Sequence, residues 1–219
     1  MSTNINFNQR KIRKNYRSLT GHFPSIKNDK SIAFESKLEN SFFLTLEFDD
    51  TVSSYQEQPQ IEISLNGKKK VYSADCYIKK VENSVERDLL VEVKYTSELE
   101  KNKEQFRDKF EAIRIAADEM NLDFMIFTEQ NFTEIELYNL DFLYRYKTHP
   151  QNNKYEEMIM NKMESMKRIK AKDLLSDISS SIVENAVISN TIWSLVANGR
   201  LHANIESKVF SMDSYVEVL

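Results

Sequence analysis

Three residues have the types and the spacing that metal-assisted hydrolysis of a phosphodiester needs. Glu92 and Lys94 stand two residues apart in the apolar stretch 89–94, and such residues point to the same face of a strand. Asp75 comes 17 residues before Glu92, and the two carboxylates converge if their strands are neighbours. Two carboxylates can hold Mg²⁺, which polarises a phosphate and lowers the pKa of a water molecule. A lysine stabilises the developing charge or positions the attacking water.

A third carboxylate is predicted on a helix that precedes these strands. Glu39 is the favoured residue and Glu35 the competing one. The alternative for Glu39 is structural, because Ser36-Lys37-Leu38-Glu39 is a capping-box pattern that would satisfy the helix N-terminus. A Glu-x-Lys pair alone is also most often a solvated ion pair. The order of a helical glutamate, a strand aspartate and then Glu-x-Lys is much less common, and it favours a catalytic metal site.

Other reactive residues predict no site of their own. Cys76 neighbours Asp75 but faces the opposite side of the strand, so we expect it in the core. As the only cysteine, it excludes an internal disulfide and favours a reducing, cytoplasmic setting. His22, His149 and His202 lack the spacing of zinc ligands.

Several elements are predicted to position the carboxylates. Phe34, Leu38, Phe42 and Leu46 recur every four residues, as on an amphipathic helix. Asn66-Gly67 is a strong hairpin signal between extended stretches at 52–65 and 71–81. The apolar strand 89–94 should lie centrally in the sheet. A helix over 98–120 then leads to a strand at 123–127, which we expect to pair in parallel with 89–94.

The rest of the chain is predicted to be turns and helices. Residues 21–25 read as a turn, and 131–145 as a short helical region. The polar stretch 149–153 is the best linker. Beyond it, helices followed by short strands at 201–205 and 209–212 resemble a winged helix-turn-helix. We therefore expect a basic arm over 1–30, an α/β catalytic domain over 31–148 and a winged-helix-like domain over 149–219.

The net charge of −4 argues against nucleic acid only until it is divided along the chain. Residues 1–30 carry seven basic side chains and one acidic, whereas 31–150 carry 15 basic and 24 acidic. Basic arms commonly contact phosphate backbones, although a solubilising tail is the plainer alternative. The candidate DNA contacts of the arm are Arg10, Lys11, Arg13, Lys14 and Arg17.

The composition excludes several classes of protein. With 219 residues, 41% hydrophobic and 29% charged, the chain can bury a core and is not a disordered tail. Three glycines and three prolines exclude collagen-like and linker-rich architectures. No apolar run approaches the roughly 18 residues that span a bilayer, and the N-terminus lacks the apolar region of a signal peptide. We expect a cytoplasmic protein with no membrane partner.

The order helical Glu, strand Asp and Glu-x-Lys resembles the restriction-endonuclease-like nucleases, the PD-(D/E)xK superfamily. Further stretches are similar to TnsA, the endonuclease subunit of heteromeric transposases, over roughly residues 10–145. These stretches are 13–25, 34–39, 46–49, 56–59, 127–129 and 139–143. Ala74 departs from the pattern where the superfamily has proline, a residue without a role in metal binding.

The resemblance implies a fold and a function. The fold would be a mixed β-sheet flanked by helices, with a small C-terminal winged-helix-like domain. Glu39, Asp75, Glu92 and Lys94 would cleave the 5′ ends of the transposon, with the three carboxylates holding Mg²⁺, for which Mn²⁺ would substitute. The partners would be DNA, the DDE-type transposase TnsB and the AAA+ regulator TnsC, in a bacterial cytoplasm. The alternatives are a stand-alone restriction or repair nuclease of the same fold and a non-catalytic DNA-binding assembly module.

Overall fold

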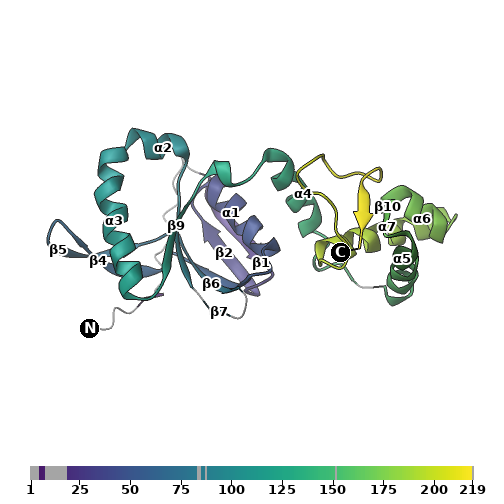
Figure 1. Cartoon of the computed structure of the whole chain (residues 1–219), viewed down its shortest axis with the longest axis horizontal. Coiled ribbons are helices and arrows are strands. Elements are labelled where there is room, and N and C mark those ends of the chain that lie inside the picture. The colour runs from purple at the N-terminus through teal and green to yellow at the C-terminus, as the bar shows by residue number, and fades with distance from the viewer. Residues whose placement is uncertain (1–4, 8–18, 83–84, 87, 151, 219) are drawn as a thin grey trace. The chain divides into compact units, whose positions relative to one another are not determined.

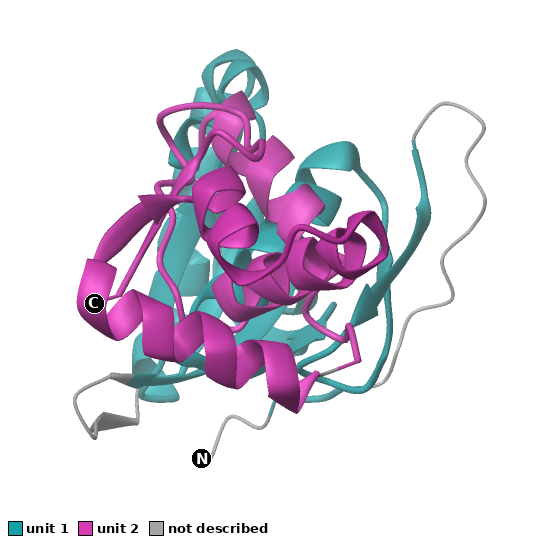
Figure 2. Ribbon diagram, turned by 90° about the vertical axis from the view of Figure 1, so that its right-hand side faces the viewer, with its two compact units in different colours: residues 1–131 teal, residues 132–219 magenta. Residues whose placement is uncertain are grey.

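The computed structural model describes residues 5–7, 19–82, 85–86, 88–150 and 152–218. By its internal contacts the chain divides into two compact units, residues 1–131 and 132–219 (Figure 2). No helix within these described ranges is long and apolar enough to cross a membrane.

The first unit is built on a mixed sheet of five strands. Its path is β3-β6-β8-β9, with the short β7 paired to β6. These strands are β3 (Val52–Glu57), β6 (Cys76–Glu82), β7 (Val85–Glu86), β8 (Leu89–Val93) and β9 (Asp123–Phe127). The predicted central position of the apolar strand and its parallel pairing with β9 are confirmed.

Helices cover both faces of this sheet (Figure 1). On one face α3 (Lys103–Glu119) packs Phe110, Ile113 and neighbouring residues against Leu90 of β8. On the other face lies α1 (Lys37–Phe48), whose Phe42 ring is 4.7 Å from that of Phe127. The short α2 (Thr96–Lys101) precedes α3, and the 3-10 turn η1 (Glu129–Asn131) follows β9. The mixed α/β architecture predicted from the sequence is confirmed.

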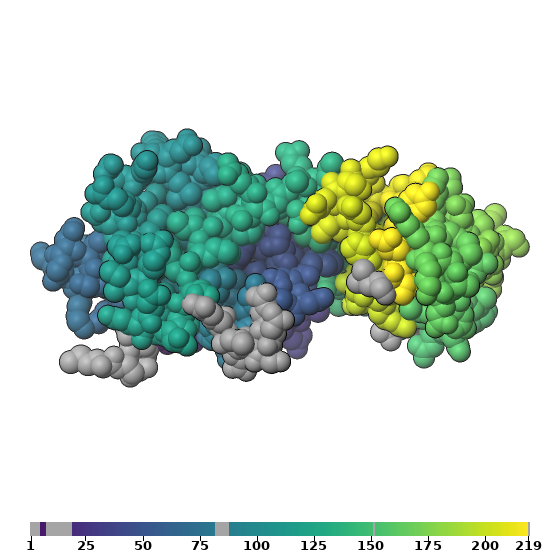
Figure 3. Space-filling model, in the orientation of Figure 1, coloured from purple at the N-terminus to yellow at the C-terminus, as the bar shows by residue number. Residues whose placement is uncertain are grey.

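A separate hairpin joins β3 to β6. It consists of β4 (Gln60–Leu65) and β5 (Lys68–Ser73) and projects from the unit (Figure 3). Asn66 and Gly67 form the turn with φ of 53° and 71°, as their sequence predicts. The single return strand predicted over 71–81 is instead broken at residues 74–75, because the chain there changes partners. Ala74 N donates to Pro59 O at the base of the hairpin, whereas Asp75 N donates to Val91 O of β8.

The prediction of a turn at 21–25 is wrong. These residues form β1 (Gly21–Ser25), which pairs antiparallel with β2 (Lys30–Phe34). The reason is local packing: a Cβ at Gly21 would lie 2.4 Å from the ring of Phe34, so the glycine lets the two strand ends approach. Phe34 accordingly ends a strand, and the helix predicted to begin there starts after Ser36.

The second unit is mostly helical. Its helices are α4 (Glu134–Tyr144), α5 (Asn153–Met166), α6 (Ala171–Ile178) and α7 (Ile182–Ala197). The strands predicted at 201–205 and 209–212 are not formed. Instead β10 (Arg168–Lys170) pairs with β11 (Tyr215–Glu217), so the two-stranded element encloses α6 and α7 in sequence rather than following them.

Helix α4 belongs to this second unit, so the expected boundary at residue 149 lies too late. Its Asn139 side chain is fully buried and bonds to three backbone groups of the loop 205–210. Phe142 packs edge-on against Trp193 of α7 with ring centroids 5.2 Å apart. These contacts reach residues more than 50 positions away, which no local sequence pattern reveals.

Candidate active site

The site lies where β6 and β8 pair. The strands are antiparallel with Cys76 opposite Val91, and Asp75 lies one residue before β6 begins. Glu92 lies inside β8, and Lys94 follows its last residue. The strand pairing that the sequence analysis assumed for Asp75 and Glu92 is therefore observed, with Asp75 just before β6 rather than inside a strand.

Lys94 links the two carboxylates. Its Nζ lies 2.9 Å from Asp75 Oδ2 and 3.3 Å from Glu92 Oε2. The same Asp75 oxygen accepts a hydrogen bond of 2.7 Å from the Val93 backbone N–H. Although burial acts to lower the pKa of Lys94, the carboxylates of Asp75 and Glu92 raise it above its usual range. The two carboxylates therefore favour the protonated ammonium form of Lys94, which donates a hydrogen bond to Asp75.

Glu92 is completely buried, and its two oxygens have different surroundings. Oε1 accepts a hydrogen bond from the hydroxyl of Tyr72 on β5. Oε2 accepts none from the described residues and lies 3.3 Å from Lys94 Nζ. Burial raises the pKa of Glu92, and the charge of Asp75 adds to this effect, while Lys94 and Tyr72 oppose it. A buried carboxylate oxygen without a hydrogen bond is unusual, and its place beside Asp75 and Lys94 is what favours a ligand site here.

Glu39 occupies the N-terminus of α1, as its structural alternative predicts. Its oxygens accept hydrogen bonds from the Ser36 hydroxyl at 3.1 Å and from the Glu35 backbone N–H at 2.9 Å. Burial raises its pKa to about 7 against these two hydrogen bonds, and the negative charge of Asp75 contributes to the rise. Glu39 is thus both a capping residue and electrostatically coupled to the site. Glu35, the competitor, accepts instead from the Gln58 side chain at 3.0 Å.

The donor atoms at this site are of the type that binds a divalent cation, but the side chains are not grouped as a complete set of ligands. Asp75 and Glu92 are hard oxygen donors, and Glu92 Oε2 is a buried oxygen without a hydrogen bond. Among the described residues, however, no three His, Cys, Asp or Glu side chains are grouped as metal ligands. Asp75 and Glu92 are joined through Lys94, while Glu39 remains in the helix cap. The fit therefore rests on the pair Asp75 and Glu92.

Part of the chain that carries these residues matches a family of known proteins. Residues 49–129 match the family described as TnsA-like endonuclease N terminal. This segment is similar to a TnsA-like endonuclease domain and is called the TnsA-like domain below. The matched segment includes Asp75, Glu92 and Lys94, whereas Glu39 lies before it. No curated protein sequence matches the chain.

Two sets of contacts in the TnsA-like domain were not predicted from the sequence. Tyr72 reaches Glu92 from the hairpin, and Lys109 of α3 lies with its Nζ 4.5 Å above the Tyr72 ring. Gln58, with a φ of 51°, joins Asp75 O to Glu35 through its backbone N–H and its side-chain amide. The alternation of β5 could have indicated that Tyr72 shares a face with Lys70 and Ala74, but nothing local connects it to a strand 20 residues away.

The remaining candidates lie elsewhere. Cys76 is buried in the core of the TnsA-like domain as expected, and burial raises the pKa of its thiol. The candidate DNA contacts Arg10, Lys11, Arg13, Lys14 and Arg17 fall outside the described residues.

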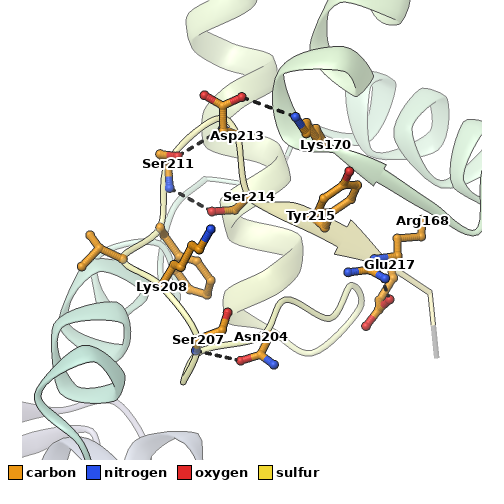
Figure 4. A pocket seen from close by; sticks show the side chains of 12 residues that line it. Arg168, Lys170, Asn204, Ser207, Lys208, Ser211, Asp213, Ser214, Tyr215 and Glu217 are labelled. Carbon is orange, nitrogen blue, oxygen red and sulfur yellow. Dashed lines mark hydrogen bonds and ion pairs between the residues drawn. The ribbon is translucent and has the colours of Figure 1, made fainter.

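The second unit has a cavity of about 550 Å³ beside β10 and β11 (Figure 4). Arg168 pairs there with Glu217 at 3.5 Å, and Lys170 with Asp213 at 3.9 Å. Its opposite charges are thus largely paired with each other, and it contains none of the residues predicted for catalysis.

Proposed function

We propose that this chain is the metal-dependent DNA endonuclease subunit of a cut-and-paste transposase. It would hydrolyse phosphodiesters at the 5′ ends of the transposon, in concert with a TnsB-type transposase and a TnsC-type regulator. The observation that carries the proposal is the pair of carboxylates, Asp75 and Glu92, around the Lys94 cation inside a TnsA-like domain.

Each residue of the pair has a role that its environment supports. Asp75 and Glu92 would hold Mg²⁺, which when bound would act as a Lewis acid on the scissile phosphate. Asp75 is fixed by the Val93 N–H, so its position depends on the backbone of β8 rather than on a mobile side chain. Such fixed ligands reduce the reorganisation that binding and reaction would otherwise require.

Lys94 would stabilise negative charge on the phosphate as it reacts. Only 17% of its side chain is exposed, so water screens its positive charge little. Its two carboxylate partners hold the ammonium in place before any substrate arrives. A cation arranged in this way contributes to rate without the cost of orienting it during the reaction.

The proposal is tested by strand-specific cleavage of a transposon-end DNA, with and without the two partner subunits and Mg²⁺. We expect 5′ cleavage by the wild type in the complete mixture and none by Asp75→Asn. Asp118→Asn is the matched control, because Asp118 is an exposed carboxylate on α3, and it should cleave normally. Retained 5′ nicking by Asp75→Asn would overturn the assignment of the site.

The same assay separates the alternative functions. Strong cleavage by the isolated chain would favour a stand-alone nuclease. Assembly with DNA and partners in which Asp75→Asn and wild type behave alike, with no cleavage of the 5′ strand, would favour a non-catalytic module.

A further inference from the structure

We propose that Tyr72 is a positioning residue for Glu92, and that Lys109 holds Tyr72 in place. The tyrosine would occupy one oxygen of the carboxylate and so present the other to the metal ion. This inference rests on the proposed function, because it assigns Tyr72 a role in the same metal site.

The first observation is that the two carboxylate oxygens of Glu92 have different partners. The Tyr72 hydroxyl donates to Oε1, while Oε2 is buried, accepts no hydrogen bond from the described residues and lies 3.3 Å from Lys94 Nζ. A carboxylate anchored through one oxygen cannot rotate freely about its terminal bond. Its other oxygen is therefore held toward Lys94 and Asp75, where a cation would bind.

The second observation is how Tyr72 itself is held. It lies on β5, in a hairpin that is not part of the main sheet, so its reach to β8 depends on packing against α3. Lys109 Nζ lies 4.5 Å from the Tyr72 ring centroid, and 5.5 Å and 5.8 Å from the rings of Phe106 and Phe110. These are cation–π distances, and the positive charge of Lys109 also acts on Glu92, whose pKa it lowers. Its contacts with aromatic rings thus fix the tyrosine from above.

Tyr77 makes a second hydrogen bond from a tyrosine hydroxyl to a carboxylate, which serves as a control for the bond between Tyr72 and Glu92. Its hydroxyl donates to the Asp88 carboxylate, again between neighbouring segments of the first unit. Neither Tyr77 nor Asp88 contacts Asp75, Glu92 or Lys94 through a hydrogen bond or ion pair. Removing this hydroxyl therefore measures the cost of losing a tyrosine–carboxylate bond away from the site.

The test is Tyr72→Phe beside Tyr77→Phe, in the full chain. Mg²⁺ and Mn²⁺ are titrated by calorimetry, and 5′ cleavage is measured across Mg²⁺ concentrations with partners present. Groups that orient metal ligands typically change affinity about 10–100-fold when removed. We expect Tyr72→Phe to weaken metal binding and to raise the Mg²⁺ midpoint within this range, with most of the rate restored at saturating Mg²⁺. Tyr77→Phe should bind metal like the wild type.

The outcomes separate this inference from the proposed function. If the wild type binds Mg²⁺ and cleaves, but Tyr72→Phe has the same metal affinity and midpoint, Tyr72 is merely structural and only this inference fails. If the wild type neither binds Mg²⁺ nor cleaves with its partners, the proposed function fails and this inference with it.

A second variant tests the inference without altering the tyrosine. Lys109→Met keeps the length of the side chain and removes its charge from the Tyr72 ring and from the surroundings of Glu92. The variant is therefore also made in the Tyr72→Phe background, where an effect exerted through the tyrosine hydroxyl disappears and a direct effect on Glu92 remains. We expect a smaller rise of the Mg²⁺ midpoint, about three- to tenfold. Lys103→Met, at an exposed position of the same helix, is the control. Equal midpoints for both lysine variants would show that Lys109 does not hold Tyr72.

Discussion

Two buried glutamates of the first unit receive a tyrosine hydrogen bond, yet their surroundings differ sharply. Glu47 of α1 is 1% exposed and accepts from the hydroxyls of Ser25 and Tyr55 at 2.6 and 2.7 Å. It also accepts from the backbone N–H groups of Ile26 and Lys27 at 3.2 and 3.1 Å. Glu92 of β8 is 0% exposed and accepts from Tyr72 on one oxygen only.

This difference separates a structural carboxylate from one available for chemistry. Glu47 has donors for both oxygens, so its burial joins the turn between β1 and β2 to α1 and β3. Glu92 has an oxygen that accepts no hydrogen bond from the described residues and lies 3.3 Å from Lys94 Nζ. Because a buried carboxylate with too few donors is costly, its retention requires a compensating role. Burial alone therefore does not identify a functional acid. What distinguishes Glu92 from Glu47 is a buried oxygen without a hydrogen bond that lies beside Lys94 and Asp75.

The largest expected effect tests whether Glu92, unlike Glu47, is needed for activity. Glu92→Gln should reduce 5′ cleavage by at least about 1,000-fold, since it removes a proposed metal ligand and a charge opposite Lys94. Its stability in metal-free buffer should fall by about 1–3 kcal/mol, because the amide keeps the shape of the side chain but loses the ion pair with Lys94. Cleavage assays and urea unfolding measure the two effects. A variant that cleaves at the wild-type rate would place Glu92 among the structural acids.

Glu47→Ala should have the converse effect. Four donors would lose their acceptor in a buried region, which should lower the free energy of unfolding by about 3–5 kcal/mol. Urea unfolding measures this loss, and cleavage per folded molecule should be unchanged at a temperature where the variant is folded. Glu62→Ala, which removes an exposed ion pair with Lys69, is the control and should cost under about 1 kcal/mol. A loss equally small at Glu47 would contradict its structural role.

Glu39 is intermediate between the two cases, because its carboxylate accepts two hydrogen bonds and yet has a raised pKa. Burial and neighbouring charges raise its pKa from 4.5 to about 7, so the folded protein binds this proton more tightly than the unfolded chain. Wild-type stability in EDTA should therefore fall as pH rises from about 4.5 to about 7, by at most ~3 kcal/mol.

Glu39→Gln should abolish this fall while retaining the cap, since glutamine also serves at this position. Its stability relative to wild type should increase through the same pH interval and stay constant above about pH 8. Urea unfolding at pH 4 and pH 8 measures the difference. Parallel pH profiles for the two proteins would show that Glu39 titrates normally.

The smallest expected effect is that of Tyr55→Phe. It removes one of four donors to Glu47, so it should lower the free energy of unfolding by about 1 kcal/mol. The Mg²⁺ midpoint of cleavage should not change, in contrast to Tyr72→Phe. Unfolding and cleavage of the two phenylalanine variants side by side would show whether the two tyrosines differ in function, as their carboxylates do.

The sequence predicted the sheet better than it predicted what surrounds it. Alternation, the Asn66-Gly67 turn and the apolar stretch of β8 are local signals, and each corresponds to an observed feature. The β1–β2 pair was missed because Pro24 and Gly21 resemble turn residues. Their strand conformation depends on packing with Phe34.

The site was partly predictable for the same reason. Asp75, Glu92 and Lys94 follow from strand periodicity once their two strands are assumed to pair, and the structure pairs them. Tyr72 and Lys109 could not be found, because their relation to Glu92 arises only when the hairpin and α3 pack together. The prediction of two strands after α7 was wrong for a similar reason. The observed pair joins β10 to β11, and α6 and α7 lie between these two strands in the sequence.

The β4–β5 hairpin restricts how this chain can change over evolution. Its six paired positions run from Gln60 opposite Ser73 to Leu65 opposite Lys68, and the strand then leads directly to Asp75. Residues added at the exposed tip would lengthen the hairpin without moving its base. A single residue gained or lost between Tyr72 and Asp75 would reverse which face of the strand one of them occupies. Related chains should therefore vary in length at the tip and keep the spacing from Tyr72 to Asp75 constant.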